Sequence, residues 1–121
     1  MANFEVFKTD NNAETFSKIL DTIEGTFPCG GETMIGRIFC FFVSNSDTLK
    51  MIYSDDQGVD WSIPATIVSS IIDASIGWKE DECGKIWLSY WKEVGGIDKH
   101  WTIYTDDSGA TWSNPIEVKT V

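Results

Sequence analysis

Residues 53–64 read YSDDQGVDWSIP and residues 104–115 read YTDDSGATWSNP, and the two segments align without a gap. Both have an aromatic residue, a hydroxyl residue, two aspartates, a glycine, a tryptophan, a serine and a proline in the same places. Repetition at a fixed period is typical of proteins built from stacked structural units. These two repeat segments therefore predict a fold made of repeated units.

A weaker third copy lies at residues 9–17, where Asn, Ala and Phe replace Asp, Gly and Trp. The copies begin at Thr9, Ser54 and Thr105, so their starts are 45 and 51 residues apart. A four-stranded β-propeller blade has about 40–50 residues. A second anchor repeats as well, because Gly36-Arg37-Ile38-Phe39 corresponds to Gly84-Lys85-Ile86-Trp87.

Each unit is expected to form four short strands. The apolar runs 38–43 and 86–91 predict strands buried on both faces. Strands at 49–53 and 101–104 lead into the repeat segments, and outer strands follow at 62–68 and 113–121, where proline is tolerated at a sheet edge. Innermost strands are placed around 26–30 and 74–78, where small residues suit a crowded axis.

The repeat segments have a local physical logic. An aspartate in a tight turn accepts hydrogen bonds from backbone N–H groups, and a hydroxyl residue adds another such bond. Gly58 and Gly109 are expected at positive φ, where a side chain would be strained. The tryptophan is expected to fold back beneath the hairpin and to bury a large apolar area.

The repeat segments resemble the Asp-box, or bacterial neuraminidase repeat. Its hydroxyl residue, Asp, Gly and Trp are matched by Ser54, Asp56, Gly58 and Trp61, and by Thr105, Asp107, Gly109 and Trp112. The resemblance implies sialidase-like propeller blades in a single domain 1–121, with a half blade at 1–24 and blades at 25–72 and 73–121. It also implies a structural role for the boxes, away from any catalytic face.

Composition narrows the possible partners. The formal charge of −10, from nineteen acidic and nine basic residues, argues against nucleic acid or an anionic membrane. No signal peptide or membrane span is visible, so a cytoplasmic or virion-associated location is expected. No cofactor or metal site is predicted, because Cys29, Cys40 and Cys83 lack metal-ligand spacing. The three are expected to be buried free thiols in a reducing setting.

The sialidase resemblance raises the question of catalysis. In that family an arginine triad holds the sugar carboxylate, a Tyr paired with a Glu is the nucleophile, and an Asp is the acid/base. This chain has one arginine, Arg37, and one histidine, His100, which is expected to be a partly exposed strand residue. No catalytic residue is assigned, and the interpretation leans against an enzyme.

Carbohydrate binding is the second hypothesis for the chain. Aromatic faces stack on sugar rings, and propeller faces often carry them. The aromatic residues outside the boxes, together with the one arginine, are the candidate sugar-binding residues: Trp78, Trp87, Trp91, Trp101, Tyr90 and Arg37. Packing between neighbouring blades is the alternative role for each of them.

Two and a half blades are too few to close a propeller, which needs about four to eight. Closure of a ring by two or three copies, or docking on another propeller chain, is therefore expected. The predicted function is a non-catalytic Asp-box module for carbohydrate or surface recognition and assembly, such as a lectin-like or phage structural subunit. A fragment or subunit of a sialidase or glycoside hydrolase is the alternative.

Overall fold

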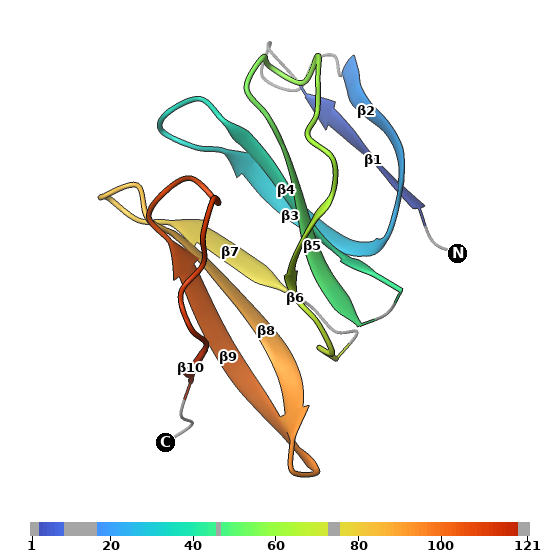
Figure 1. Cartoon of the computed structure of the whole chain (residues 1–121). Coiled ribbons are helices and arrows are strands. Elements are labelled where there is room, and N and C mark those ends of the chain that lie inside the picture. The colour runs from blue at the N-terminus through green and yellow to red at the C-terminus, as the bar shows by residue number, and fades with distance from the viewer. Residues whose placement is uncertain (1–2, 9–16, 46, 73–75, 119–121) are drawn as a thin grey trace.

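The computed structural model describes residues 3–8, 17–45, 47–72 and 76–118, and ten β-strands lie within these ranges. The strands form three antiparallel sheets, and no helix occurs in this part of the chain (Figure 1). The predicted all-β class is therefore confirmed.

The strands follow one another across each sheet in chain order. The N-terminal sheet pairs β1 (Asn3–Lys8) with β2 (Ser17–Glu24). The middle sheet contains β3 (Thr26–Glu32), β4 (Ile38–Ser44), β5 (Thr48–Ser54) and β6 (Ala65–Val68). The C-terminal sheet contains β7 (Gly77–Glu80), β8 (Ile86–Val94), β9 (Ile97–Thr105) and β10 (Ile116–Glu117). The two four-stranded sheets approach each other at β3 and β7.

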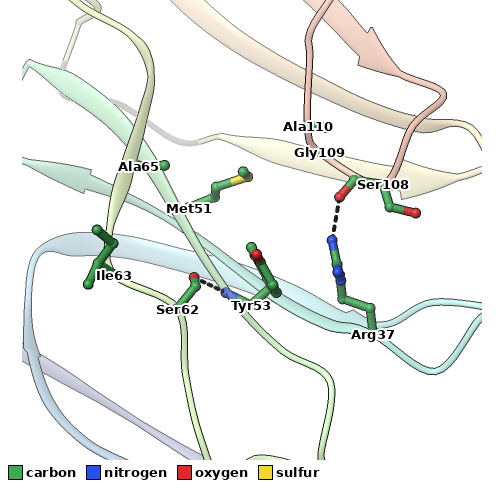
Figure 2. Close-up of a pocket in the computed structure, with 9 residues that line it drawn as sticks. All are labelled: Arg37, Met51, Tyr53, Ser62, Ile63, Ala65, Ser108, Gly109 and Ala110. Carbon is green, nitrogen blue, oxygen red and sulfur yellow. Dashed lines mark hydrogen bonds between the residues drawn. The ribbon is translucent and has the colours of Figure 1, made fainter.

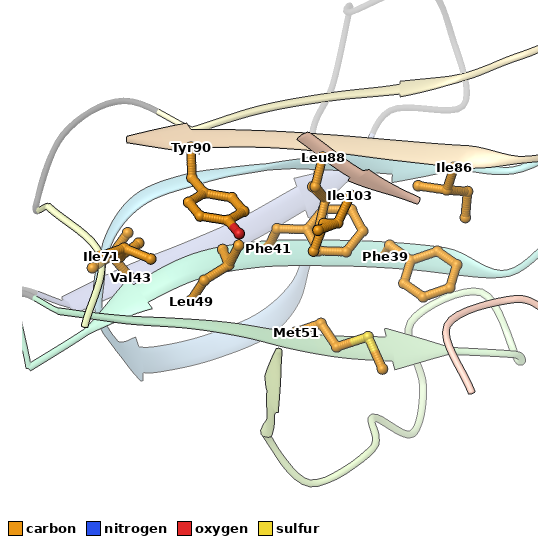
Figure 3. Packing of buried hydrophobic residues seen from close by; sticks show 10 residues of the cluster. All are labelled: Phe39, Phe41, Val43, Leu49, Met51, Ile71, Ile86, Leu88, Tyr90 and Ile103. Atoms are coloured by element: carbon orange, nitrogen blue, oxygen red, sulfur yellow. The ribbon is translucent and has the colours of Figure 1, made fainter. Parts of the chain in front are cut away.

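The main hydrophobic core lies between the middle and C-terminal sheets (Figure 3). Side chains on neighbouring strand positions point to opposite faces of a sheet, so every second residue can enter this core. Fully or nearly buried residues from both sheets meet there: Phe39, Phe41, Val43, Leu49 and Met51 from the middle sheet, and Ile86, Leu88, Tyr90 and Ile103 from the C-terminal sheet. The burial of these faces holds the two sheets together.

The opposite face of the middle sheet is also buried, around Cys40, Phe42 and Ile52, with Trp61 packed against them. Every residue of β4 from Phe39 to Ser44 is consequently buried, which confirms the two-sided burial predicted for residues 38–43.

The same prediction is wrong for residues 86–91. Burial alternates along β8, where Trp87 and Ser89 are half-buried and Trp91 is 38% exposed. These three side chains lie on the face turned away from the middle sheet, which we call the outward face. No described residue of another sheet covers it, so only the inward side of β8 is fully buried.

Close approach between strands explains two of the glycines in β3. A Cβ on Gly30 would lie 2.1 Å from the backbone oxygen of Phe39, and one on Gly31 would lie 2.9 Å from the Trp78 ring. The small residues expected in the innermost strand are therefore required by the neighbouring strand and by the next sheet. At the far end of the C-terminal sheet, Gly95 and Gly96 both have positive φ and form the two-residue turn between β8 and β9.

The strands at 26–30, 38–43 and 49–53 were predicted close to their observed bounds. The outer strands begin later than predicted, at Ala65 and Ile116, because the residues after each tryptophan are bonded back to the preceding strand. Strands β8 and β9 are longer than predicted, and β7 begins at Gly77. Residues 9–16, 73–75 and 119–121, which include most of the third repeat copy, lie outside the described residues.

Replacement of Leu88 tests the contact between the two four-stranded sheets. Leu88→Ala leaves a cavity in the fully buried core, so the free energy of unfolding should fall by about 2–5 kcal/mol. Urea unfolding followed by fluorescence measures the change. Val94→Ala, at a residue that is 43% exposed near the hairpin end, should have a much smaller effect. Equal effects would contradict this packing.

Candidate functional site

The two repeat turns, residues 54–61 and 105–112, have the same hydrogen-bonding pattern. In the first, the Gly58 N–H donates to Ser54 Oγ at 2.8 Å, and the Ser54 hydroxyl donates to Asp56 Oδ1 at 2.8 Å. The Asp60 N–H also donates to Asp56 Oδ1, at 2.8 Å. The side chains of Ser54 and Asp56 thus bond to each other and to backbone N–H groups of the same turn, which fixes its shape.

The second repeat turn is built in the same way around Asp107. Its carboxylate accepts hydrogen bonds from the Thr105 hydroxyl at 2.6 Å, from the Thr111 N–H at 2.9 Å and from the Thr111 hydroxyl. These bonds, with that from Thr105 the largest contribution, lower the pKa of Asp107 to about 2. The pKa of Asp56 is lowered by the corresponding bonds from Asp60 and Ser54.

Backbone conformation explains the glycine of each repeat turn. Gly58 and Gly109 both have φ of 89°, as expected from the sequence. The residue before each glycine, Gln57 or Ser108, is also in the left-handed region, with φ of 61° and 57°. The left-handed conformation of Gln57 and Ser108 was not predicted, because residues other than glycine rarely adopt it.

The repeat tryptophans pack under their hairpins. Trp61 donates its indole N–H to the Gly58 carbonyl oxygen at 3.0 Å and packs against the second core. Trp112 packs against the main core, with its ring edge-on to Phe41 at 6.1 Å between centroids. Both are half-buried, so these residues serve the packing of the sheets.

The serine that follows each repeat tryptophan joins the repeat turn to the preceding strand, a role that was not predicted from the sequence. The Tyr53 N–H donates to Ser62 Oγ at 2.9 Å, and the Ser62 N–H donates to the Tyr53 carbonyl oxygen at 2.8 Å. Ser113 makes the same pair of bonds with Tyr104, at 3.0 Å and 2.8 Å. The identity of this serine in both repeats was the signal available in the sequence.

Arg37 links the middle sheet to the C-terminal sheet. Its guanidinium donates to both carboxylate oxygens of Asp55, at 2.7 and 2.9 Å, and to the Ser108 carbonyl oxygen at 2.9 Å. The guanidinium also stacks over Tyr53, with its carbon 3.9 Å from the ring centroid. The hydrogen bond between Arg37 and Asp55 raises the pKa of the arginine and lowers that of the aspartate.

A cavity of about 310 Å³ opens beside this link (Figure 2). Its lining comes from the middle sheet and from the second repeat turn: Arg37, Met51, Tyr53, Ser62, Ile63, Ala65, Ser108, Gly109 and Ala110. Arg37 is the one charged residue among them, and its guanidinium is held by Asp55 and Ser108. The cavity therefore offers little charge to an anionic ligand.

Three of the aromatic residues predicted to bind sugars contribute to the core. Tyr90 is fully buried, and Trp78 and Trp101 pack against the main core. Burial raises the pKa of Tyr90. Trp87 and Trp91 are the two candidates that the structure places together on the outward face.

The outward face carries paired residues in rows across β8 and β9. Trp87 is opposite Tyr104, with 5.0 Å between ring centroids, and Trp91 stacks on His100, also at 5.0 Å. Between these aromatic rows lies a row of two hydroxyl residues, Ser89 and Thr102, and beyond them an acidic row, Glu93 and Asp98.

The edges of the outward face add further side chains. Ile116 on β10 pairs with Thr102 and is 48% exposed, and Lys79 on β7 pairs with Trp87. Lys85, at the position equivalent to Arg37, places its Nζ 4.5 Å from the Tyr104 centroid and 5.6 Å from that of Trp87. The face thus has two aromatic rows with a hydroxyl row between them, a basic end at Lys79 and Lys85, and an acidic end at Glu93 and Asp98.

Comparison of the two repeat units shows which middle-sheet residues correspond to the outward face. The outward residues of β8 and β9 occupy the positions that Phe39, Phe41, Val43, Leu49 and Met51 fill in the middle sheet: Trp87, Ser89, Trp91, His100 and Thr102, respectively. The middle-sheet set is buried in the main core. Alignment of the two units could have identified the outward face from the sequence, although His100 and Thr102 were not recognised as part of it.

The cysteines differ in their surroundings. Burial raises the pKa of Cys40 to about 12 and that of Cys29 to about 11. Cys83 is exposed, so the prediction of three buried thiols is wrong for this residue. It lies in the turn before β8, where its N–H donates to Asp81 Oδ1.

Comparison with models of known protein families gives no match, and no curated protein matches the chain in sequence. Within the ranges that the structure describes, no group of three or more His, Cys, Asp and Glu side chains is placed to hold a metal ion. In the same ranges, no helix is long and apolar enough to cross a membrane.

The pKa of Asp107 leads to a prediction about acid stability. Because the pKa is about 2 in the folded chain and near 3.8 when unfolded, this carboxylate stabilises the fold above about pH 5 and loses that effect as the pH falls toward 2. Asp107→Asn should reduce stability at neutral pH and make its decline toward pH 2 shallower. Urea unfolding across this pH range measures both effects.

Asp98→Asn is the matched control, since it makes the same change of charge at an exposed residue near the start of β9, at the opposite end of the C-terminal sheet. If both variants change the pH profile equally, the hydrogen bonds around Asp107 do not set its contribution.

Proposed function

We propose that the chain is a non-catalytic Asp-box module of a sialidase-like β-propeller, and that it assembles with further copies of itself through the outward face. Each four-stranded sheet corresponds to one blade in this proposal. The matched bonding of Ser54, Asp56 and Gly58 with Thr105, Asp107 and Gly109 supports the Asp-box assignment. Two such sheets are fewer than a closed propeller needs.

One observation carries the assembly proposal: the outward face of the C-terminal sheet is exposed, whereas the equivalent face of the middle sheet is part of the main core. In the middle sheet this face is fully covered, whereas Trp91 and Ile116 are 38% and 48% exposed in the C-terminal sheet. Aromatic residues of this kind are enriched at protein interfaces, and contiguous exposed apolar surface marks interaction sites. A ring closed by two or three copies would cover it.

The surroundings of Arg37 favour assembly over sialidase chemistry. In the alternative function, this arginine would have to turn toward a sugar carboxylate. It is instead bonded to Asp55 and to the Ser108 carbonyl oxygen, and it stacks over Tyr53. A carboxylate ligand would have to displace Asp55 from a bidentate pair, which is among the stronger protein hydrogen-bonding arrangements.

Self-association is tested by substitution on the outward face. The chain should form a defined oligomer, and Trp91→Glu should shift it to monomer, because a carboxylate would be buried among aromatic rings without a partner. Size-exclusion chromatography with light scattering measures the mass. Val59→Glu, at a residue that is 78% exposed in the first repeat turn, is the control and should leave the oligomer intact. A monodisperse monomeric wild type would refute the assembly proposal.

Carbohydrate recognition is a second candidate function, favoured by the arrangement of Trp87 and Trp91. Their rows flank the hydroxyl groups of Ser89 and Thr102, and Gly77 on β7 opposes Ser89 without a side chain to cover it. Rings that stack on sugars, with hydroxyl groups between them, suit a neutral glycan.

Titration with a panel of neutral glycans tests this second function. Binding should quench or shift the tryptophan fluorescence of the wild type, and Trp91→Ala should abolish the response. Trp101→Phe, in the core, removes a tryptophan from the other face of β9 and should preserve it. The absence of any response from the wild type would leave these rings with a packing role alone.

A further inference from the structure

Rows of large and small side chains alternate along the outward face of the C-terminal sheet. Two aromatic pairs form the large rows, each with 5.0 Å between its ring centroids: Trp87 with Tyr104, and Trp91 with His100. Ser89 and Thr102 form the hydroxyl row between them, and Gly77 on β7 continues that row. An added Cβ on Gly77 would lie 3.1 Å from Ser89 Oγ, so the serine hydroxyl lies directly beside this glycine. A row of small residues is thus flanked by two rows of rings.

Charged side chains lie at the two ends of this face. Lys79 on β7 pairs with Trp87, whereas Glu93 pairs with Asp98 beyond the second aromatic row. Because a strand rises about 3.4 Å per residue, the length of β8 from Trp87 to Glu93 sets these ends roughly 20 Å apart. The three charged side chains are exposed, and within the described ranges no ion pair joins any of them to another residue.

We infer that two copies of this chain pair outward face to outward face, with the row of Trp91 and His100 in each copy on the hydroxyl row of the other. The pair is related by a twofold axis that lies between the faces and runs across the strands, so β8 of one copy is antiparallel to β8 of the other. Lys79 of each copy then lies next to the acidic row of the other. This inference rests on the proposed function and adds to it the number of copies and their orientation.

Reversal of the row order is the geometric argument for this pairing. A twofold axis across the strands sets the first of the four rows against the fourth, and the second against the third. The rings of Trp91 and His100 therefore lie over Ser89 and Thr102, so that large side chains meet small ones, as close packing of two sheets about 10 Å apart requires. The same reversal brings the lysine beside the first row to the acidic row. Side-chain size and charge complementarity thus favour the same orientation.

The same residues disfavour the other twofold arrangement, in which the axis runs parallel to the strands. Each row would then meet its own equivalent in the other copy. Trp91 would lie against the second Trp91, and these rings would hold the two hydroxyl rows apart. Glu93 and Asp98 would also face the same two carboxylates of the other copy, and like charges set against each other weaken association.

Exchange of the charges tests this orientation. Lys79→Glu and Glu93→Lys should each weaken self-association by about tenfold, because each sets like charges against one another at two places in the pair. Both substitutions together in one chain should restore association. Since the two positions are roughly 20 Å apart within one copy, only a contact between copies can give this rescue. Lys92→Glu, on the inward side of β8 opposite Lys99, is the control and should leave association unchanged.

Filling of the hydroxyl row tests the packing separately. Ser89→Leu should weaken association by about tenfold, because the larger side chain takes the place of the Trp91 ring of the other copy. Ser69→Leu, at an exposed residue directly after β6, is the matched control. The outward face is smaller than the roughly 20–30 residues a side of a stable interface, so sedimentation velocity should extend upward from low micromolar concentrations. Circular dichroism shows that each variant is folded.

Cross-linking of the wild type by a carbodiimide, which joins amines to carboxylates in contact, gives a measurement that needs no variant. The expected product joins Lys79 to Glu93 or Asp98 of another copy. A wild type that stays monomeric overturns both this pairing and the proposed assembly. An oligomer of more than two copies, a folded double variant that fails to restore association, or cross-links from Lys79 to other carboxylates instead would overturn the pairing and leave self-assembly standing.

Discussion

The packing of Leu88 and Tyr90 against Phe41 and Leu49 is the contact on which the other features depend. An isolated four-stranded sheet has no second layer against which to bury its apolar faces, so it supplies little hydrophobic core. In this chain, one face of the middle sheet packs against the C-terminal sheet, and its other face is buried as well. Within the described part of the chain, the C-terminal sheet has only its inward face covered, and the exposure of Trp91 follows directly.

Arg37 adds direction to this packing. Hydrophobic contacts are not directional, so the main core by itself would tolerate small shifts of one sheet on the other. The guanidinium fixes one point of the C-terminal sheet by its bond to Ser108, while Asp55 and Tyr53 hold the guanidinium itself. Because Ser108 lies in a turn that is closed by Thr105 and Asp107, this fixed point is itself rigid.

The sequence predicted the elements that repeat and missed what depends on three-dimensional neighbours. The central strands and the left-handed glycines follow from apolar runs and from turn chemistry, which are local. The exposure of Cys83 and the one-sided burial of β8 depend on which sheet lies beside which, so apolar character alone misassigned them. Tyr90 and Trp101 were among the candidate sugar-binding residues, because aromatic side chains occur both in cores and in binding faces.

The residues of the outward face are more polar than those at the equivalent positions of the middle sheet. A face meant for permanent burial keeps side chains such as Phe41 and Met51, whereas a face left in water during synthesis and folding must remain soluble. Ser89 and Thr102 at the equivalent positions lower its apolar area, and His100 replaces Leu49 beside Trp91. The rings of Trp87 and Trp91, on either side of the row of Ser89 and Thr102, remain as large apolar groups of the face. The polar replacements and the retained rings are compatible with the proposed assembly, because interfaces between separately folded chains combine aromatic and polar residues.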